Sequence, residues 1–373
     1  MSIEHWAWSV EYFYQPMISV RGWVFNGLLV MILLFVGCKK TMQTTDSPIN
    51  LQIWYGDQQQ FGSPGLAQRW INILGNVSSP HGIQEMHYKL NEGASKSLSL
   101  GSDLHRLAAT GDFNVDIDAV SCQDGANWLV LEVVDSAGNQ VTSEMTFQYH
   151  QGNRWPLPYT IEWAEVEEIQ QVAQIVDGHW EITDEGIHNL DTFYDRVIAF
   201  GDTSWHNYEV STTVIFHDFT PPVKGPPTYN VSHAAIASRW PGHDTDDLQP
   251  HRKWYPLGAT SEFRLTKNLD SCRWRIFDGD KPGFERFYVE QVEGEYRQIA
   301  LNKKYGMKHR VETIGPDRTR YSVKLWPYDQ PEPEAWDFQG IENDENLPGG
   351  SALLLAHNTS VTFGDVYVIS IKN

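Results

Sequence analysis

Hydrophobic and polar residues alternate in short runs along the chain from residue 51 onward. The run FNVDIDA at 113–119 places its apolar residues on one face and Asn114, Asp116 and Asp118 on the other, which we expect to face solvent. This two-residue period is typical of half-buried β-strands. The strands expected in the first part of the chain are 51–55, 68–74, 84–90, 113–119, 128–134 and 141–149.

The spacing of these strands predicts an immunoglobulin-like β-sandwich over residues 51–150. The turn DSAGN at 135–139 separates the last two strands, and Gly138 and Asn139 can adopt the positive φ angles that a hairpin loop needs. About seven short strands in roughly 100 residues is the pattern of such a sandwich. The Cys…Trp…Cys spacing of antibody domains is absent from the sequence, so the expectation concerns architecture alone.

A second and larger β region follows the segment QGNRWPLP at 151–158, where two prolines interrupt β pairing. About ten or more strands in residues 155–373 exceed an immunoglobulin-like sandwich and predict a jelly roll of two antiparallel sheets. A short helix competes with strand structure only at 169–175. The expected strands are 178–182, 195–200, 208–216, 234–240, 273–277, 309–313, 321–326, 351–356 and 366–371.

Five motifs follow one another in this second region: DGHWEI, GDTSWHNYEVSTTV, HAAIASRW, YSVKLWP with EPEAW, and GSALLLAHNTSVTFGDVYV. In this order they resemble the concanavalin A-like lectin/glucanase superfamily in its LamG-like bacterial form, over about residues 159–373. The resemblance implies an all-β jelly roll. It implies no single function, because this fold hosts lectins, glycosidases, lyases and adhesion modules.

The stretch GLLVMILLFVGCKK at 27–40 is strongly apolar. The run from Leu28 to Val36 is shorter than the ~20 residues needed to cross a bilayer, and it matches the hydrophobic part of a signal peptide. Its ending FVGC resembles a bacterial lipobox, although Phe35 stands where Leu is usual, and this implies that Cys38 receives the lipid.

We therefore predict a lipoprotein signal peptide over 1–38 and a flexible linker over 39–50, with Met1 or Met17 as the start. An uncleaved signal anchor is the alternative.

The formal net charge of -20 argues against nucleic acid and anionic surfaces as partners, because phosphates would be repelled. Besides Cys38, the chain has only Cys122 and Cys272, and neither belongs to a CxxC or Cys/His cluster. We therefore expect two free thiols and no zinc site.

Glucanases of this superfamily carry carboxylates at alternate positions of one strand. Side chains two residues apart share a face, and a retaining mechanism needs two carboxyl groups ~5–5.5 Å apart. The pairs Glu165/Glu167 and Glu293/Glu295 have this spacing, but they lie in an acidic entrance segment and in a turn. No catalytic residue is predicted, and glycosidase activity is disfavoured.

Aromatic and basic residues near strand ends of the second region predict a saccharide-binding surface. Tryptophan rings stack on sugars, and charged groups bind hydroxyls or carboxylates; packing in the core is the alternative for each tryptophan. Salt bridges with Asp244, Asp246 or Asp247 compete for Arg239 and His243. The candidate residues are Arg239, Trp240, His243, Trp254, Arg264, Trp274, Lys324, Trp326 and His357.

A structural calcium ion is a further expectation. Carbohydrate-binding sandwiches often hold one where the first and last strands meet, and Glu162 and Asp365 resemble those two positions. Asp202 could add a ligand, since Ca²⁺ prefers carboxylate and backbone oxygens. The alternative is that Asp365 accepts hydrogen bonds from backbone amides.

Together these patterns predict an exported, lipid-anchored protein of the cell envelope, on the periplasmic face or the cell surface. Its jelly roll would bind a poly- or oligosaccharide, or another surface ligand, without catalysis. A polysaccharide lyase with a His or Tyr base beside arginine is the alternative, and a structural envelope protein is the second alternative.

Replacing Cys38 by Ala should abolish lipidation, because no other residue of the predicted lipobox carries a thiol. Metabolic labelling with a palmitate analogue measures this. Label that persists on Cys38→Ala would contradict the lipobox prediction.

Overall fold

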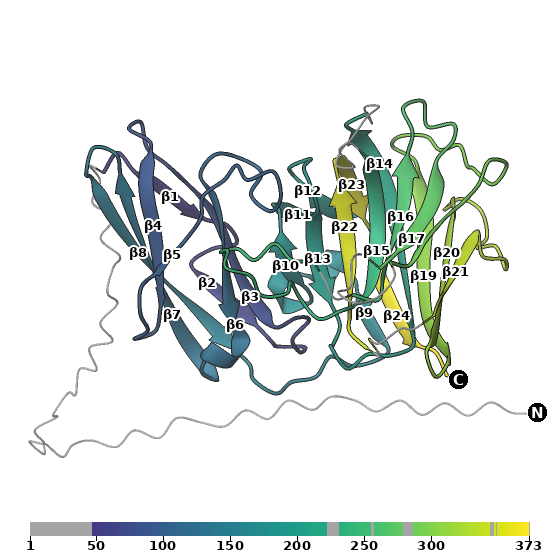
Figure 1. Cartoon of the computed structure of the whole chain (residues 1–373), viewed down its shortest axis with the longest axis horizontal. Helices are drawn as coiled ribbons and strands as arrows, with labels where there is room; N and C mark the ends of the chain where they lie inside the picture. Colours follow the sequence, from purple (N-terminus) through teal and green to yellow (C-terminus); the bar gives the residue numbers. More distant parts are fainter. Residues whose placement is uncertain are drawn as a thin grey trace, which may run out of the picture. The chain divides into compact units, whose positions relative to one another are not determined.

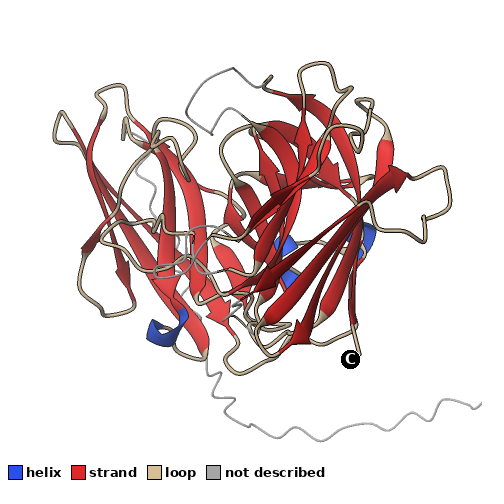
Figure 2. Cartoon of the chain, turned by 45° about the vertical axis from the view of Figure 1, so that its right-hand side comes forward, coloured by secondary structure: helices blue, strands red, loops and turns tan. Residues whose placement is uncertain are grey.

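The structure is a computed structural model that describes residues 47–221, 231–254, 257–278, 286–343, 347 and 349–372. The expected signal peptide, Cys38 and most of the linker lie outside these residues. Within the described ranges no helix has both the length and the hydrophobicity to cross a bilayer. Strands make up most of this part of the chain, and the helical segments are single short turns (Figure 2).

The first strands form a β-sandwich of two sheets, ordered β1-β3-β6 and β2-β8-β7-β4-β5. All neighbouring pairs are antiparallel except β2 and β8, which are parallel. Cys122, just beyond β6, is a free thiol. The bounds are β1 Asn50–Ile53, β2 Gln58–Phe61, β3 Trp70–Ser78, β4 Ile83–Leu90, β5 Lys96–Ser97, β6 Asp112–Asp118, the 3₁₀ turn η1 Ala119–Ser121, β7 Gly125–Asp135 and β8 Gln140–Tyr149.

The remaining strands form a second sandwich, whose sheets we name by their strand order. The front sheet is β10-β13-β22-β15-β16-β17-β18, and the back sheet is β11-β12-β23-β14-β19-β20-β21, with β24 beside β14 and β9 beside β24 (Figure 1). Every pair in both sheets is antiparallel.

The front-sheet strands are β10 Gln174–Asp177, β13 Arg196–Phe200, β15 Ser232–Trp240, β16 Ala259–Leu265, β17 Arg273–Phe277, β18 Tyr288–Glu290 and β22 Ser351–His357. The back-sheet strands are β9 Tyr159–Ile161, β11 Trp180–Thr183, β12 Gly186–Asn189, β14 Tyr208–Phe219, β19 Lys304–Gly315, β20 Arg318–Pro327, β21 Phe338–Asn343, β23 Thr359–Phe363 and β24 Val366–Ser370. Two 3₁₀ turns, η2 Trp163–Glu165 and η3 Ile169–Gln171, precede β10.

The hydrophobic core of the second sandwich lies between its two sheets. On β20, Tyr321, Val323 and Leu325 are fully buried, and each pairs with a buried residue of β19. The predicted all-β fold with two sandwiches is confirmed. At 169–175, where a helix was possible, only the turn η3 forms before the chain enters β10.

A polar network joins the two sandwiches. Arg106, in the loop before β6, donates two hydrogen bonds to Asp116 (2.6 and 3.1 Å) and one to Asp177 at the end of β10 (2.7 Å). Asn114 donates to the same Asp177 carboxylate at 3.0 Å. Asn114 and Asp116 are therefore buried rather than facing solvent, because the second sandwich covers this face of β6. The expectation of a solvent face is wrong for these two residues.

His309 of β19 is buried between the front and back sheets, where its Nδ1 lies 2.8 Å from the hydroxyl of Ser261 on β16. Burial, and then the charge of Arg239, lower the pKa of His309 from 6.5 to about 3. Between pH 6.5 and about 3 the unfolded chain therefore binds a proton that the folded chain does not. Protonation of His309 therefore favours the unfolded chain. The free energy of unfolding is at its full value above pH 6.5 and falls as the pH drops from 6.5 towards 3.

Replacing His309 by Gln, which keeps a polar group beside Ser261, should make stability depend less on pH. We expect the slope of the unfolding free energy between pH 6 and pH 4 to fall by up to about 1.4 kcal/mol per pH unit, the value of one proton. Urea unfolding at a series of pH values measures this slope. Parallel curves for His309→Gln and the native chain would rule out this contribution.

Candidate functional site

The alternation of β16 turns one set of side chains away from the core. Ser261 and Phe263 face the interior, whereas Thr260, Glu262 and Arg264 lie on the outer face of the front sheet. The register places Glu262 opposite Arg275 of β17. The outer face of this sheet therefore carries a group of charged residues in its middle strands.

Three arginines on this face share two glutamates. Arg275 binds Glu262 through Nη2 at 2.6 Å and through Nε at 2.7 Å, and Arg273 binds Glu290 through Nε at 2.6 Å. Arg264 lies between these pairs, 3.7 Å from Glu262 and 3.5 Å from Glu290. Each glutamate thus already has one close arginine. Arg264 adds a third positive charge to the two negative charges of Glu262 and Glu290.

The pKa values reflect this imbalance. Burial lowers the pKa of Arg264, and the positive charge of Arg275 lowers it further, so that Glu262 and Glu290 compensate only in part. Burial also acts against the charge of Arg275, but Glu262 outweighs it and raises that pKa. The guanidinium of Arg264 is therefore under-neutralised where it stands, and an added anion would stabilise it.

Two histidines border the charged group. The rings of His233 on β15 and His357 at the end of β22 stack with centroids 4.7 Å apart and planes 9° apart. His233 Nε2 lies 3.3 Å from Glu262, and His357 Nδ1 lies 2.7 Å from Asp195. Burial, followed by the charges of His357, Arg275 and Arg264, lowers the pKa of His233 well below its ordinary value, so its ring is neutral at pH 7. Within the described residues, its Nδ1 has no hydrogen-bond partner.

Asp195, His233 and His357 have ligand atoms within 4.8 Å of one another, and no other group of three such residues is found in the described part of the chain. The two imidazole planes are nearly parallel, so their lone pairs run side by side instead of converging on one point. We therefore describe the three as a stacked Asp–His–His group.

A cavity of about 550 Å³ opens over these residues. Its size lies within the range of about 300–1,000 Å³ typical of small-molecule sites. Aromatic side chains complete its wall beside Glu262, the arginines and the histidines; they are Tyr194, Trp254, Phe277 and Tyr288.

Three of the residues predicted to bind ligand lie at this cavity: Trp254, Arg264 and His357. Trp240 and Trp274 lie in the core, as the packing alternative holds. His243 is buried and stacks on Trp254, with ring centroids 5.0 Å apart.

Two further predicted residues lie on the outer face of the back sheet. Lys324 there is bound to Glu332 at 2.6 Å and to the carbonyl of Pro333 at 2.7 Å. Trp326 lines a separate hollow on that face.

Arg239, expected to bind the ligand, is instead completely buried. Its guanidinium crosses from β15 to the back sheet, where it donates to Thr319 Oγ1 at 3.0 Å and Thr313 Oγ1 at 2.8 Å, and to the carbonyl of His206 at 3.2 Å. A buried charge is tolerated only when its donors are satisfied. Arg239 therefore joins the two sheets, and its donors are directed away from any surface.

Two of the three carboxylates predicted to hold calcium accept hydrogen bonds within the fold. Asp365 Oδ1 accepts a hydrogen bond from Trp163 N at 3.0 Å, as the backbone alternative holds. Asp202 accepts from Ser204 N at 2.9 Å and Trp155 N at 3.2 Å. Glu162, Asp202 and Asp365 do not gather as one group of three ligands among the described residues. Calcium at Glu162 and Asp365, with backbone oxygens added, stays a prediction.

Sequence reasoning missed Glu262, Arg275, His233 and Asp195 as members of one site. The signal was present in two strands, as T-x-E-x-R at 260–264 and R-x-R at 273–275. A search for two carboxylates on one strand does not find these two motifs. They combine a glutamate with arginines on the same strand or on the next one. Glu262 and Arg275 come together because of the register between β16 and β17. This register could not be predicted from the sequence.

No protein-family model matches the sequence, and no curated protein matches it. Similar solved structures include the exoplasmic/lumenal domain of VIP36 in a Ca²⁺-bound form, at 9% identity and a TM-score of 0.37, covering 57% of this chain and 90% of that one. The endo-β-1,4-glucuronan lyase from the fungus Trichoderma reesei has 8% identity and a TM-score of 0.33, covering 57% and 90%.

The endo-β-1,4-mannanase from Thermotoga petrophila matches at 12% identity and a TM-score of 0.21, over 29% of this chain and only 20% of its own. Likeness of this extent carries no functional argument.

Replacing Glu262 by Gln should destabilise the protein strongly. The side chain is 3% exposed, and its loss of charge would leave the arginines around it uncompensated. We expect a loss of about 3–5 kcal/mol in the free energy of unfolding, measured with urea. The matched control is Glu185→Gln, which removes the more exposed partner of Lys304 and should cost about 0–1 kcal/mol. Equal costs for the two variants would contradict the shared-carboxylate arrangement.

Proposed function

We propose that the protein binds an anionic polysaccharide, through its uronate carboxylates, on the outer face of the front sheet. The observation that carries this proposal is the sharing of two glutamates by three arginines, which leaves Arg264 under-neutralised beside a cavity. A guanidinium binds a carboxylate with two parallel hydrogen bonds, and such charge-assisted bonds are among the strongest in proteins.

The walls of the cavity favour a sugar over a small inorganic anion. Tyr194, Trp254 and Tyr288 line it together with the charged residues. Aromatic rings offer flat apolar faces, and a tyrosine hydroxyl adds a polar tip, which suits the mixed surface of a sugar ring. The rest of the protein is strongly acidic, so a polyanion would be held at this local group of arginines rather than by the general surface.

In this proposal the site binds the polysaccharide and does not cleave it. Burial opposes the charge of Glu290, but hydrogen bonds from Tyr288 and Arg273 lower its pKa below its ordinary value. Glu262 is held by Arg275 in a two-point ion pair. Glycoside hydrolysis needs one carboxyl group that stays protonated to act as an acid, and carboxylates fixed by arginines do not supply it.

A lyase that cleaves the same polymer by β-elimination is the second candidate. The observation that favours it is the neutral ring of His233 in the wall of the cavity, beside Arg264 and Arg275. A neutral imidazole can accept a proton, and an arginine beside it could neutralise the uronate. Formation of an unsaturated uronate product, lost in His233→Ala, would replace binding by this activity.

Attachment to a membrane through Cys38 and location in the cell envelope are also proposals, and they are supported by the N-terminal sequence. In this arrangement the first sandwich would separate the polysaccharide site from the membrane.

Replacing Arg264 by Gln should weaken binding of an acidic polysaccharide while it preserves the fold. Glu262 keeps Arg275 and Glu290 keeps Arg273, so only the surplus charge is lost. We expect affinity for polygalacturonate or alginate to fall about tenfold or more, as for one lost charge-assisted hydrogen bond. Affinity electrophoresis of the purified full chain measures this, and binding should also weaken with added salt.

The matched control is Arg318→Gln, which removes an exposed arginine from β20 of the back sheet and should leave retention unchanged. Both variants must show native melting curves. The proposal is wrong if neither polyuronate retards the native chain, or if Arg264→Gln and Arg318→Gln are retained equally.

A further inference from the structure

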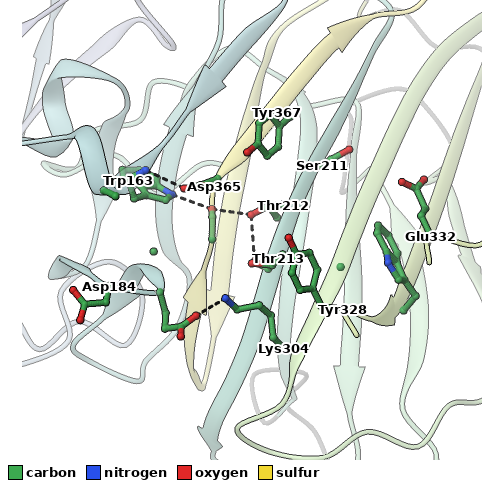
Figure 3. Close-up of a pocket in the computed structure, with 16 residues that line it drawn as sticks. Trp163, Asp184, Ser211, Thr212, Thr213, Lys304, Tyr328, Glu332, Asp365 and Tyr367 are labelled. Carbon is green, nitrogen blue, oxygen red and sulfur yellow. Dashed lines mark hydrogen bonds and ion pairs between the residues drawn. The ribbon is translucent and has the colours of Figure 1, made fainter. Parts of the chain in front are cut away.

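The outer face of the back sheet carries a second hollow, on the side of the sandwich opposite to the arginine group. Its floor is a row of residues placed opposite one another by the strand register: Thr213 of β14, Gly306 of β19 and Trp326 of β20. Tyr367 of β24 pairs with Ser211 of β14 one pleat away. Four strands therefore contribute side chains to one surface (Figure 3).

Trp326 lies down against the sheet because Gly306 has no side chain. A Cβ atom built on Gly306 would stand 2.3 Å from two carbons of the indole, closer than real atoms approach. The ring thus covers the glycine and presents its other face outward. Gly306 has an ordinary φ angle, so the glycine serves the close approach of this ring and not a special backbone conformation.

Two tyrosines extend this aromatic surface. Tyr328 follows Trp326 along the chain and is 57% exposed, and Tyr367 is 47% exposed. Figure 3 shows both beside Thr213 and Ser211, with Trp163 and Asp184 at one end of the hollow and Glu332 at the other. The hollow measures about 260 Å³, close to the lower limit of about 300 Å³ for small-molecule sites. Large aromatics are costly to leave in water, and here three of them border one small recess.

The charges around this hollow are mixed and differ in kind from those of the front sheet. Asp184, Glu185, Glu332 and Asp365 line it, and Lys304 is the cation among its lining residues. Lys304 forms an ion pair with Glu185, and Glu332 is bound by Lys308 at 2.7 Å and by Lys324 at 2.6 Å. Two of these four acids are thus neutralised by lysines. The described residues that line the hollow include no arginine that could bind a uronate carboxylate through two parallel hydrogen bonds.

We propose that this hollow binds a neutral sugar ring of a polysaccharide, stacked on Trp326 and flanked by Tyr328 and Tyr367. The apolar face of a pyranose fits a flat indole, and its hydroxyls can donate to Asp184 and Asp365 or accept from Lys304. The site is independent of the arginine group on the front sheet. One chain would thus hold an acidic polymer on one face and a neutral one on the other.

Affinity electrophoresis of the full chain in gels that contain galactomannan, hydroxyethylcellulose or laminarin tests this inference. We expect retardation by at least one of these neutral polymers, unchanged by added salt because no ion pair with the ligand forms. Trp326→Ala and Tyr328→Ala should each weaken it about tenfold, the loss of one stacking contact. Since Tyr328 is mostly exposed, its variant should fold even where Trp326→Ala does not.

Trp128→Ala is the matched control, because Trp128 is an exposed tryptophan (49%) on β7 of the first sandwich. It should bind the neutral polymer like the native chain, and Arg264→Gln should do the same. Absence of retardation by all three neutral polymers, or native retardation of Tyr328→Ala, overturns the inference. Neither result bears on polyuronate binding, so this site and the front-sheet site succeed or fail separately.

Discussion

A charge that leaves water must find partners inside the protein, and this constraint shapes the molecule at three levels. Arg106 is held between Asp116 and Asp177 and joins the two sandwiches. Arg239 passes between the two sheets of the second sandwich and bonds to hydroxyls and carbonyls of the far sheet. Glu262 gathers Arg275 and Arg264 on the outer face. Removing one member of such a group leaves a buried charge without a partner. The resulting loss of stability is larger than the net stability that the complete group provides.

The three groups differ in how well their charges balance, and this difference separates structure from function. Arg239 uses its guanidinium on partners within the fold and has nothing to offer a ligand. Arg106 faces two carboxylates, so acidic groups outnumber it. Of these three groups, the one on the front sheet has more arginines than carboxylates. The surplus positive charge is that of Arg264. An external anion would stabilise this charge, and so it would bind there most favourably.

The sequence was sufficient for the architecture because β-sandwiches depend on a local two-residue period. The alternation in β20 assigned Tyr321, Val323 and Leu325 to the core without reference to any other strand. The same rule misassigned Asn114 and Asp116 because a polar face can be covered by a second sandwich, which is information about tertiary contact. It also could not distinguish Arg239 from Arg264, two arginines at similar strand positions. A bulge between Ala237 and Trp240 turns Arg239 inward, whereas Arg264 stays in regular register.

The polar seam at Arg106 has a mechanical consequence. When two domains are joined only by a flexible segment, a force applied to one domain first extends the segment. The other domain then does not rotate. Here the guanidinium and the Asn114 amide grip the end of β10, the edge strand of the front sheet. Tension applied to the first sandwich would therefore reach the front sheet through these side chains as well as through the connecting chain.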